Sequence, residues 1–340
     1  MEKQNRLVIY PSPGMGDLVW ITPHLRVLAK SIGPFSLLIP KSACAETLLK
    51  EEGFLNAILP FSRKVLTKEG TERNPDDYMH QGFKGFWRLV RDLKKHRFDE
   101  VWIFDRRPLF AWACYLAGIP KRYGYGFKDD RFILHGPFMP KQMQKVHARA
   151  RATAFMAAHG LSIQETEQPL NVEDAVLKKI KQKIKDLPKP IILFGIGATD
   201  QHRKWQAKSF AAVATHAMTQ FQGTLYIVGG PKEMAEARTI KKYVPKVDHD
   251  RVMISEEFSI EDTLALAKES ALYFGNDTFL LNVMAMEGRP TLTVFRSAGD
   301  VLAYRHNMHA LIPPDDKCGT EHVTVDQAVG VLEKMIFSII

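Results

Sequence analysis

Cysteine is scarce in this chain of 340 residues, which has three cysteines and no C-x-x-C pair. Scattered cysteines in an odd number are typical of packed, reduced thiols. Long apolar runs are also missing, because no stretch approaches the roughly 18 residues of a membrane span. The first six residues, MEKQNR, lack the apolar core of a signal peptide. The sequence therefore predicts a globular protein of the cytoplasm.

Acidic residues are too few in the first half of the chain to balance its basic ones. Residues 1–160 hold 26 Lys and Arg against 15 Asp and Glu, which leaves 21 of the 47 basic and 23 of the 38 acidic residues for the other 180. So basic a half is either a solvated face or a surface for an anionic partner. Because no nucleic-acid-binding module or aromatic stacking platform is recognisable, acidic lipid or a phosphorylated substrate is favoured over nucleic acid. Basic pairs near the ends of predicted elements are Arg63-Lys64, Arg106-Arg107 and Lys121-Arg122.

Strands and helices alternate along the whole chain. Strands are predicted near 6–10, 35–40, 57–60, 99–105 and 121–126, and again near 191–196, 224–228, 252–255, 271–275 and 291–295. This alternation predicts an α/β protein with two Rossmann-like, doubly wound domains that face each other across a cleft. We expect a first domain over residues 1–165, a linker over 166–189 and a second domain over 190–324. A last helix over 325–340 is expected to pack back on the first domain.

The first predicted strand is followed by the turn Gly14-Met15-Gly16-Asp17 and a helix. A dinucleotide fingerprint, G-x-G-x-x-G, needs a third glycine where this chain has Val19, and the Asp17 carboxylate would repel a pyrophosphate. The dipole of the helix favours an ionised carboxylate, so Asp17 is placed to accept a proton as a base. Alternatively, Asp17 only caps the helix.

Four stretches occur in an order and spacing that resemble glycosyltransferase family 9, the bacterial heptosyltransferases of lipopolysaccharide core assembly. They are GMGD with TPHLRVL behind it, GIGATDQHRKWQAKSFAAVA, YIVGGPKEMAEA, and FSIEDTLALAKESALYFGNDTFLLNVMAMEGRPTLTVF. The resemblance covers nearly the whole chain. It implies a GT-B fold, no cofactor, and inverting transfer of a sugar, heptose from ADP-heptose first of all, from a nucleotide-diphosphate donor to an acidic lipopolysaccharide core acceptor.

The resemblance also implies roles for individual residues. Asp17 matches the proposed base of the family, and Arg203 with Lys204 matches the basic position that steadies the leaving diphosphate. The donor-binding positions of the family fall on Ala198, Thr199, Glu233, Asp277 and Thr278, of which Glu233 would reach the ribose. For the acceptor, an anionic glycolipid met at the inner face of the inner membrane, we expect contacts from Gly16 and from the basic pairs Arg63-Lys64, Arg106-Arg107 and Lys121-Arg122.

The chain departs from the family pattern at the start of the helix after Thr278. Where the family typically reads D-T-G-P-x-H, this chain places Phe279 at the glycine and Asn282 at the histidine. A ring at the glycine position stands where the backbone would approach the diphosphate. Two alternatives therefore stay open: an altered homologue that uses another nucleotide sugar or only binds one, and a nucleotide-sugar epimerase of the same architecture.

No metal site is expected. Asp248-His249-Asp250 spells D-x-D, but it lies in a polar loop before a weak strand and is predicted to be a solvated turn. Charge on the leaving diphosphate can instead be met by Arg203, Lys204, the hydroxyl groups and a helix N-terminus.

Overall fold

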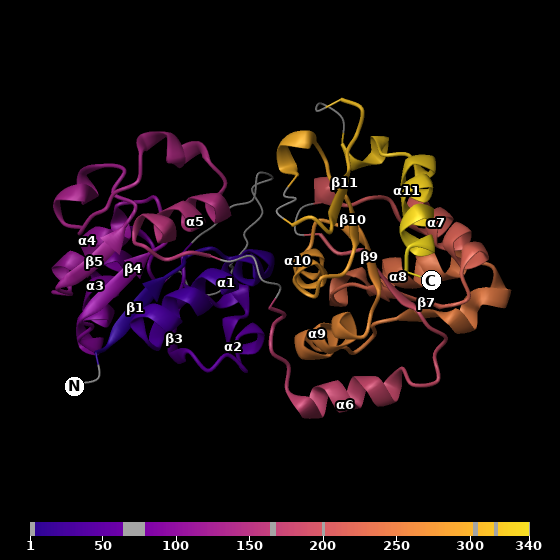
Figure 1. Ribbon diagram of the computed structural model, residues 1–340, viewed down its shortest axis with the longest axis horizontal. Coiled ribbons are helices and arrows are strands. Elements are labelled where there is room, and N and C mark those ends of the chain that lie inside the picture. Colours follow the sequence, from indigo (N-terminus) through magenta and orange to yellow (C-terminus); the bar gives the residue numbers. More distant parts are fainter. Residues whose placement is uncertain are drawn as a thin grey trace. The chain divides into compact units, whose positions relative to one another are not determined.

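The computed structural model of the chain describes residues 4–63, 79–163, 168–198, 201–301, 305–315 and 319–339. Lys64 and Thr199, both predicted to be site residues, lie outside these ranges. The chain divides into two compact units, Met1–Thr166 and Glu167–Ile340. Each unit has its own parallel sheet (Figure 1). Each unit also has its own hydrophobic core.

The first unit is built on a five-stranded parallel sheet in the order β3-β2-β1-β4-β5. Its strands are β1 (Arg6–Ile9), β2 (Phe35–Pro40), β3 (Leu55–Phe61), β4 (Glu100–Ile103) and β5 (Lys121–Gly124). Its helices are α1 (Met15–Ile32), α2 (Ala45–Leu48), α3 (Gly82–His96), α4 (Leu109–Leu116) and α5 (Ala148–Ala158). Strand β2 is buried at all six residues, as expected for a strand covered by helices on both faces.

The second unit is built on a six-stranded parallel sheet in the order β11-β10-β9-β6-β7-β8. Its strands are β6 (Ile191–Gly195), β7 (Thr224–Val228), β8 (Val252–Ile254), β9 (Leu272–Asn276), β10 (Thr291–Val294) and β11 (Met308–Leu311). Its helices are α6 (Asp174–Lys183), α7 (Ala207–Gln220), α8 (Met234–Tyr243), α9 (Ile260–Lys268), α10 (Phe279–Met286) and α11 (Val325–Phe337). This strand order is that of a complete Rossmann sheet, and the first sheet has the same order less its last strand.

In both sheets the strand order reverses beside the first strand of the unit. The reversal lies between β1 and β4 in the first unit and between β6 and β9 in the second. Ligands of doubly wound sheets bind outside the carboxyl ends of the strands at such a point. The loops that follow β1, β4, β6 and β9 are therefore the places to look for a site.

Close packing at the centre of the second sheet depends on glycine. A Cβ on Gly275 would lie 2.3 Å from the carbonyl oxygen of Gly195 on the neighbouring strand, and one on Gly195 would lie 2.3 Å from the Tyr273 hydroxyl. Glycine at both positions leaves the space that the Tyr273 side chain occupies next to the two strands. Next to it, the rings of Trp205, Phe210, Phe274 and Phe194 pack edge to face in the core.

The C-terminal helix does not follow our expectation. Helix α11 was predicted to pack back on the first domain, but its buried residues Ala328, Leu332 and Ile336 belong to the hydrophobic core of the second unit. It packs against α7, and the ring of His216 on α7 lies within hydrogen-bond distance of its Glu333 carboxylate. The apolar stripe of α11 was visible in the sequence, but the sequence does not say which sheet the stripe covers.

Candidate active site

Asp17 lies in the first turn of α1, three residues after the helix N-cap Gly14. Its carboxylate accepts hydrogen bonds from the Ser12 hydroxyl and, at 3.3 Å, from Trp20 Nε1. The N-cap residue Gly14 has no side chain with which to cap the helix, and both of these hydrogen bonds to Asp17 come from side chains rather than from backbone N–H groups of the first turn. A Cβ on Gly14 would lie 2.9 Å from Asp17 Oδ2, so a larger residue there would displace the carboxylate from its present position.

Aromatic and basic side chains surround the Asp17 carboxylate within the first unit. The Trp20 ring lies 5.5 Å from the His147 ring, and the buried Tyr10 hydroxyl donates to the Asp17 carbonyl oxygen at 3.3 Å. Burial lowers the pKa of His147; the charge of Asp17 opposes that shift, and the charge of Arg151 adds to it. The result is a partly buried, neutral imidazole beside the carboxylate at neutral pH.

The loop after β4 brings a second basic group to the same edge of the sheet. The Phe104 amide donates to the Ile9 carbonyl oxygen, so the chain after β4 leaves the sheet beside the turn after β1. There the Arg107 guanidinium makes paired hydrogen bonds of 2.8 and 3.0 Å to the Asp105 carboxylate. Arg106 donates to the Gln144 carbonyl oxygen at 3.4 Å. Arg63 follows the carboxyl end of β3, and so it too belongs to this edge.

Lys121 and Arg122 lie elsewhere. They open β5 and pair with Glu100 and Val101 at the start of β4, which places them at the amino edge of the sheet, opposite Asp17. The Arg122 guanidinium is used structurally, because it donates to the carbonyl oxygens of Ile119, Pro120 and Ile133. The structure therefore does not bring this basic pair together with Asp17, Arg106 and Arg107.

In the second unit, Asn276 at the end of β9 holds the site loops in place. This fully buried side chain donates to the Ile196 carbonyl oxygen at 2.8 Å and accepts from the Trp205 amide at 2.9 Å. It thus joins the end of β9 to the loop after β6, which leads to Ala198, and to the segment that carries Arg203 and Lys204. The Arg203 guanidinium reaches the Asp277 carboxylate at 2.8 Å.

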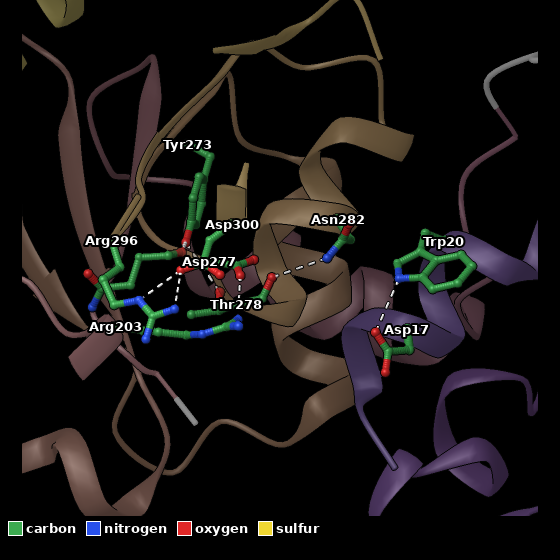
Figure 2. Close-up of polar contacts among 10 residues, drawn as sticks. Asp17, Trp20, Arg203, Tyr273, Asp277, Thr278, Asn282, Arg296 and Asp300 are labelled. Atoms are coloured by element: carbon green, nitrogen blue, oxygen red, sulfur yellow. Dashed lines mark hydrogen bonds and ion pairs between the residues drawn. The ribbon is translucent and has the colours of Figure 1, made fainter. Parts of the chain in front are cut away.

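Asp277 and Thr278 lie at the start of α10, with Thr278 as the N-cap residue (Figure 2). The Tyr273 hydroxyl donates to the Asn276 carbonyl oxygen at 2.6 Å and lies 3.2 Å from Thr278 Oγ1. Burial raises the pKa of Tyr273, so the hydroxyl keeps its proton. The first backbone N–H groups of α10 have no acceptor within the helix, and Thr278 makes no side-chain cap hydrogen bond to them, which makes this N-terminus a favourable place for an anion.

Phe279 and Asn282 occupy the first two turns of α10. Phe279 is its first residue and is half-buried, whereas Asn282 is buried and donates to the Thr278 carbonyl oxygen at 3.4 Å. The Asn282 amide is therefore directed back toward the N-terminus of its own helix, as Figure 2 shows.

Lys204 is directed to a different element from Arg203. Its ammonium group lies 2.8 Å from Glu236 and 3.4 Å from Glu233, both at the start of α8. Burial alone would lower the pKa of Lys204, but the hydrogen bonds and charges of these two acids outweigh it, and the pKa is raised. Glu233 also accepts the Gly230 amide at 3.1 Å. Lys204 is thus held as a cation at the nucleoside end of the predicted site.

Two further site residues, Arg296 and Asp300, were not predicted from the sequence. They follow β10, where the Arg296 guanidinium pairs with the Asp300 carboxylate at 2.7 Å. Burial would raise the pKa of Asp300, but the hydrogen bond and charge of Arg296, with the charge of Arg203, lower it. Figure 2 shows both arginines gathered around the two aspartates beside the start of α10. The signal was their position directly after a predicted strand.

The D-x-D sequence is a structural turn. Asp248 was predicted to be solvated, but it is buried, and its carboxylate pairs with Arg251. The His249 ring is hydrogen-bonded to the Val244 carbonyl oxygen at 2.9 Å. Within the described ranges, no group of three or more His, Cys, Asp or Glu side chains could hold a metal ion. Across those same ranges, no helix is long and apolar enough to span a bilayer.

The fold has close counterparts among solved structures. The structure of Escherichia coli ADP-heptose lipopolysaccharide heptosyltransferase II is similar with a TM-score of 0.71 and 17% identity, over 98% of this chain and 99% of that one. A glycosyltransferase family 9 protein from Veillonella parvula is similar with a TM-score of 0.73 and 13% identity, over 98% of this chain and 97% of that one. The fold is therefore that of the two-domain glycosyltransferases of the GT-B type.

The sequence narrows this class to one family. The sequence model of glycosyltransferase family 9 (heptosyltransferase) matches residues 86–319. Lipopolysaccharide heptosyltransferase 1 of Campylobacter coli is 21% identical over an alignment of 254 residues that covers 69% of this chain and 72% of that protein. The chain belongs to glycosyltransferase family 9, and it is a glycosyltransferase of the heptosyltransferase type.

Proposed function

We propose that the chain transfers a heptose from ADP-heptose, with inversion at the anomeric carbon, to a hydroxyl of an acidic lipopolysaccharide core acceptor. The observation that carries this proposal is the cluster of Arg203, Arg296, Asp277 and Thr278 at the N-terminus of α10 in a member of this family. Two relatives named above support it: the Campylobacter coli protein is a lipopolysaccharide heptosyltransferase, and the Escherichia coli structure is that of an ADP-heptose lipopolysaccharide heptosyltransferase.

In the proposed reaction the second unit binds the donor. Departure of the nucleoside diphosphate moves the electron pair of the C1–O bond onto a β-phosphate oxygen, where negative charge develops. Arg203, Arg296 and the N-terminus of α10 supply positive charge there, and arginine can hold phosphate with two parallel hydrogen bonds. Glu233 would accept the ribose hydroxyls, while Asp277 and Thr278 would bind the sugar and diphosphate; Thr199 and Ala198 remain proposed donor contacts.

The first unit supplies the acceptor side. As the acceptor oxygen forms its bond to C1, its proton passes to the Asp17 carboxylate, and base catalysis of this kind contributes about 10²–10⁴-fold in rate. The Ser12 and Trp20 hydrogen bonds fix the orientation of that carboxylate. Gly16, Arg63, Arg106 and Arg107 share its edge of the sheet and would contact the anionic acceptor, and the protein would work at the cytoplasmic face of the inner membrane.

Acceptor-dependent release of ADP from ADP-heptose tests the proposal. A panel of nucleotide sugars is first screened by thermal shift, since a donor at 100 times its Kd stabilises the folded protein by about 2.7 kcal/mol. The screened donors are then incubated with and without a truncated core acceptor. Conversion of the sugar without acceptor would support an epimerase, and binding without turnover would support a protein that has lost catalysis. Either result would refute the proposed transfer.

A further inference from the structure

One face of α3 carries large aromatic side chains that the fold leaves in solvent. Phe83 is 77% exposed and Trp87 is 47% exposed, although tryptophan is normally largely buried. The two residues are one helical turn apart, and their rings meet edge to face at 6.2 Å. The exposed aromatic surface is therefore continuous over the first two turns of the helix.

The core of the first unit does not need these rings. The buried stripe of α3 consists of Gly85, Leu89, Val90 and Leu93, and it packs against α4 and the sheet. Gly85 also fixes the rotation of the helix, because a Cβ there would lie 2.2 Å from the backbone of His80. With Gly85 held against that backbone, Phe83 and Trp87 are held on the outer face.

Basic residues are also exposed along the helix that carries the two rings. Lys84, Arg88, Arg91, Lys94 and Lys95 are all exposed on α3. The single acidic residue of the helix, Asp92, pairs with Lys95 at 3.1 Å and lies 3.7 Å from Arg91. Lys84 and Arg88, which flank the two rings in sequence, are not part of that ion pair.

The position of this face agrees with the acceptor edge of the sheet. A helix that connects two parallel strands starts at their carboxyl edge and returns to their amino edge. The first turns of α3, with Phe83 and Trp87, therefore lie toward the edge that carries Asp17 and Arg107 within the first unit.

We propose that the face of α3 formed by Phe83, Lys84, Trp87 and Arg88 docks on an anionic lipid bilayer. The rings would enter the headgroup region, where aromatic side chains are favoured, and the cations would meet the lipid phosphates. A second copy of the chain fits this face poorly, because two such faces carry like charge. The cores of protein interfaces are also depleted in lysine. The functional role of this docking rests on the proposed function, because it would bring the protein to its lipid-borne acceptor. The docking itself can be measured without any substrate.

Sedimentation of the full chain with vesicles tests the proposal. We expect binding to vesicles that contain phosphatidylglycerol and little binding to vesicles of phosphatidylcholine alone. Combined Lys84→Gln and Arg88→Gln should weaken binding about 25-fold, at roughly fivefold for each removed cation near the surface. Combined Phe83→Ser and Trp87→Ser should weaken it at least about tenfold, because buried apolar area is lost.

Matched controls come from the second unit. Tyr243 and Phe337 are also exposed, at 57% and 66%, so Tyr243→Ser with Phe337→Ser removes similar surface elsewhere. Lys178→Gln with Lys242→Gln removes two exposed cations elsewhere. Equal loss of binding in the control and α3 variants, or retained binding in the α3 variants, would overturn the proposal.

Trp87 fluorescence separates lipid contact from other kinds of association. The difference between the spectra of the wild type and Trp87→Phe should shift to shorter wavelength with anionic vesicles and be quenched by brominated lipid. If the α3 variants change the oligomeric state without vesicles and the difference spectrum does not respond to lipid, the face joins protein copies instead. Transfer to a water-soluble acceptor fragment should be unchanged in the α3 variants. A protein that binds vesicles but transfers no sugar would refute the proposed function and leave the docking intact.

Discussion

Replacement of Asp17 by asparagine removes the proposed base while it preserves the shape of the side chain. The asparagine oxygen can still accept from Trp20 Nε1, and its amide can donate to the Ser12 hydroxyl, which can serve as acceptor. The cost in stability is the difference between hydrogen bonds to a charged and to a neutral acceptor, about 1 kcal/mol. For a cooperative unit of the size of Met1–Thr166, which contains Asp17, that loss corresponds to a shift in Tm of roughly 2–4 °C.

The expected loss in catalysis is much larger. Without a base, kcat should fall about 10²–10⁴-fold, which is about 2.7–5.5 kcal/mol in the barrier. Donor affinity, measured by calorimetry, should not change, because the donor-binding residues belong to the other unit. Trp20→Phe removes one hydrogen bond but keeps the carboxylate, so it should retain most of the activity. Turnover of Asp17→Asn close to that of the wild type would refute the assignment of the base.

Four further predictions concern the rest of the molecule. Glu233→Ala should weaken the binding of ADP and of the intact donor equally, whereas Asp277→Ala should weaken the binding of the intact donor more than that of ADP. Calorimetry with both ligands checks this, and equal losses of affinity for the two ligands in both variants would contradict it. Phe279→Gly should change donor affinity or donor choice in the nucleotide-sugar panel and leave the acceptor KM unchanged, and the reverse pattern would place the ring away from the donor. Arg106→Glu should raise the acceptor KM severalfold at low salt, and high salt should screen this effect. Lys121→Glu, at the opposite edge of the sheet, should leave the acceptor KM unchanged. Equal effects of the two variants would show that the basic half attracts the anionic acceptor through its overall charge and not through particular residues. Burial, with the charge of Arg149, lowers the pKa of His24 from 6.5 to about 3. Below about pH 6.5 the unfolded state therefore binds a proton that the folded state does not, and the free energy of unfolding should fall by about 1.4 kcal/mol per pH unit as the pH is lowered. In denaturant titrations between pH 6 and 4, His24→Gln should lose this pH dependence, and an unchanged dependence would show that His24 does not cause it.

Most of the fold could be predicted from the sequence, because buried parallel strands are short apolar runs bounded by turns. All five strands predicted in the second half lie within one residue, at each end, of an observed strand, namely β6, β7, β8, β9 and β10. Strand β11, MHAL, was missed. Its two middle residues are exposed, so its sequence lacks the apolar run that predicts a buried strand. Its place at the edge of the sheet is shown by its pairing with β10.

The positions of candidate site residues could be predicted from the sequence where a side chain directly follows a strand, but not where long-range tertiary contacts determine the position. The positions of Asp17 and Asp277 follow from the strand–turn–helix pattern alone. The separation of neighbouring Arg203 and Lys204, one toward Asp277 and the other toward α8, depends on long-range contacts that no local pattern contains. The wrong prediction that Lys121 and Arg122 lie beside Asp17 could have been avoided, because residues that open a parallel strand lie at the amino edge of the sheet.

The packing of α11 in the second unit has a consequence for engineering. Because this helix stays with the sheet that precedes it, each unit is one uninterrupted segment of chain, joined to the other by a single passage near residue 166. A chimera that pairs the first unit of one relative with the second unit of another therefore requires one junction and no separate graft of the C-terminal helix. In such hybrids the choice of hydroxyl and the choice of activated sugar could be inherited from different parents.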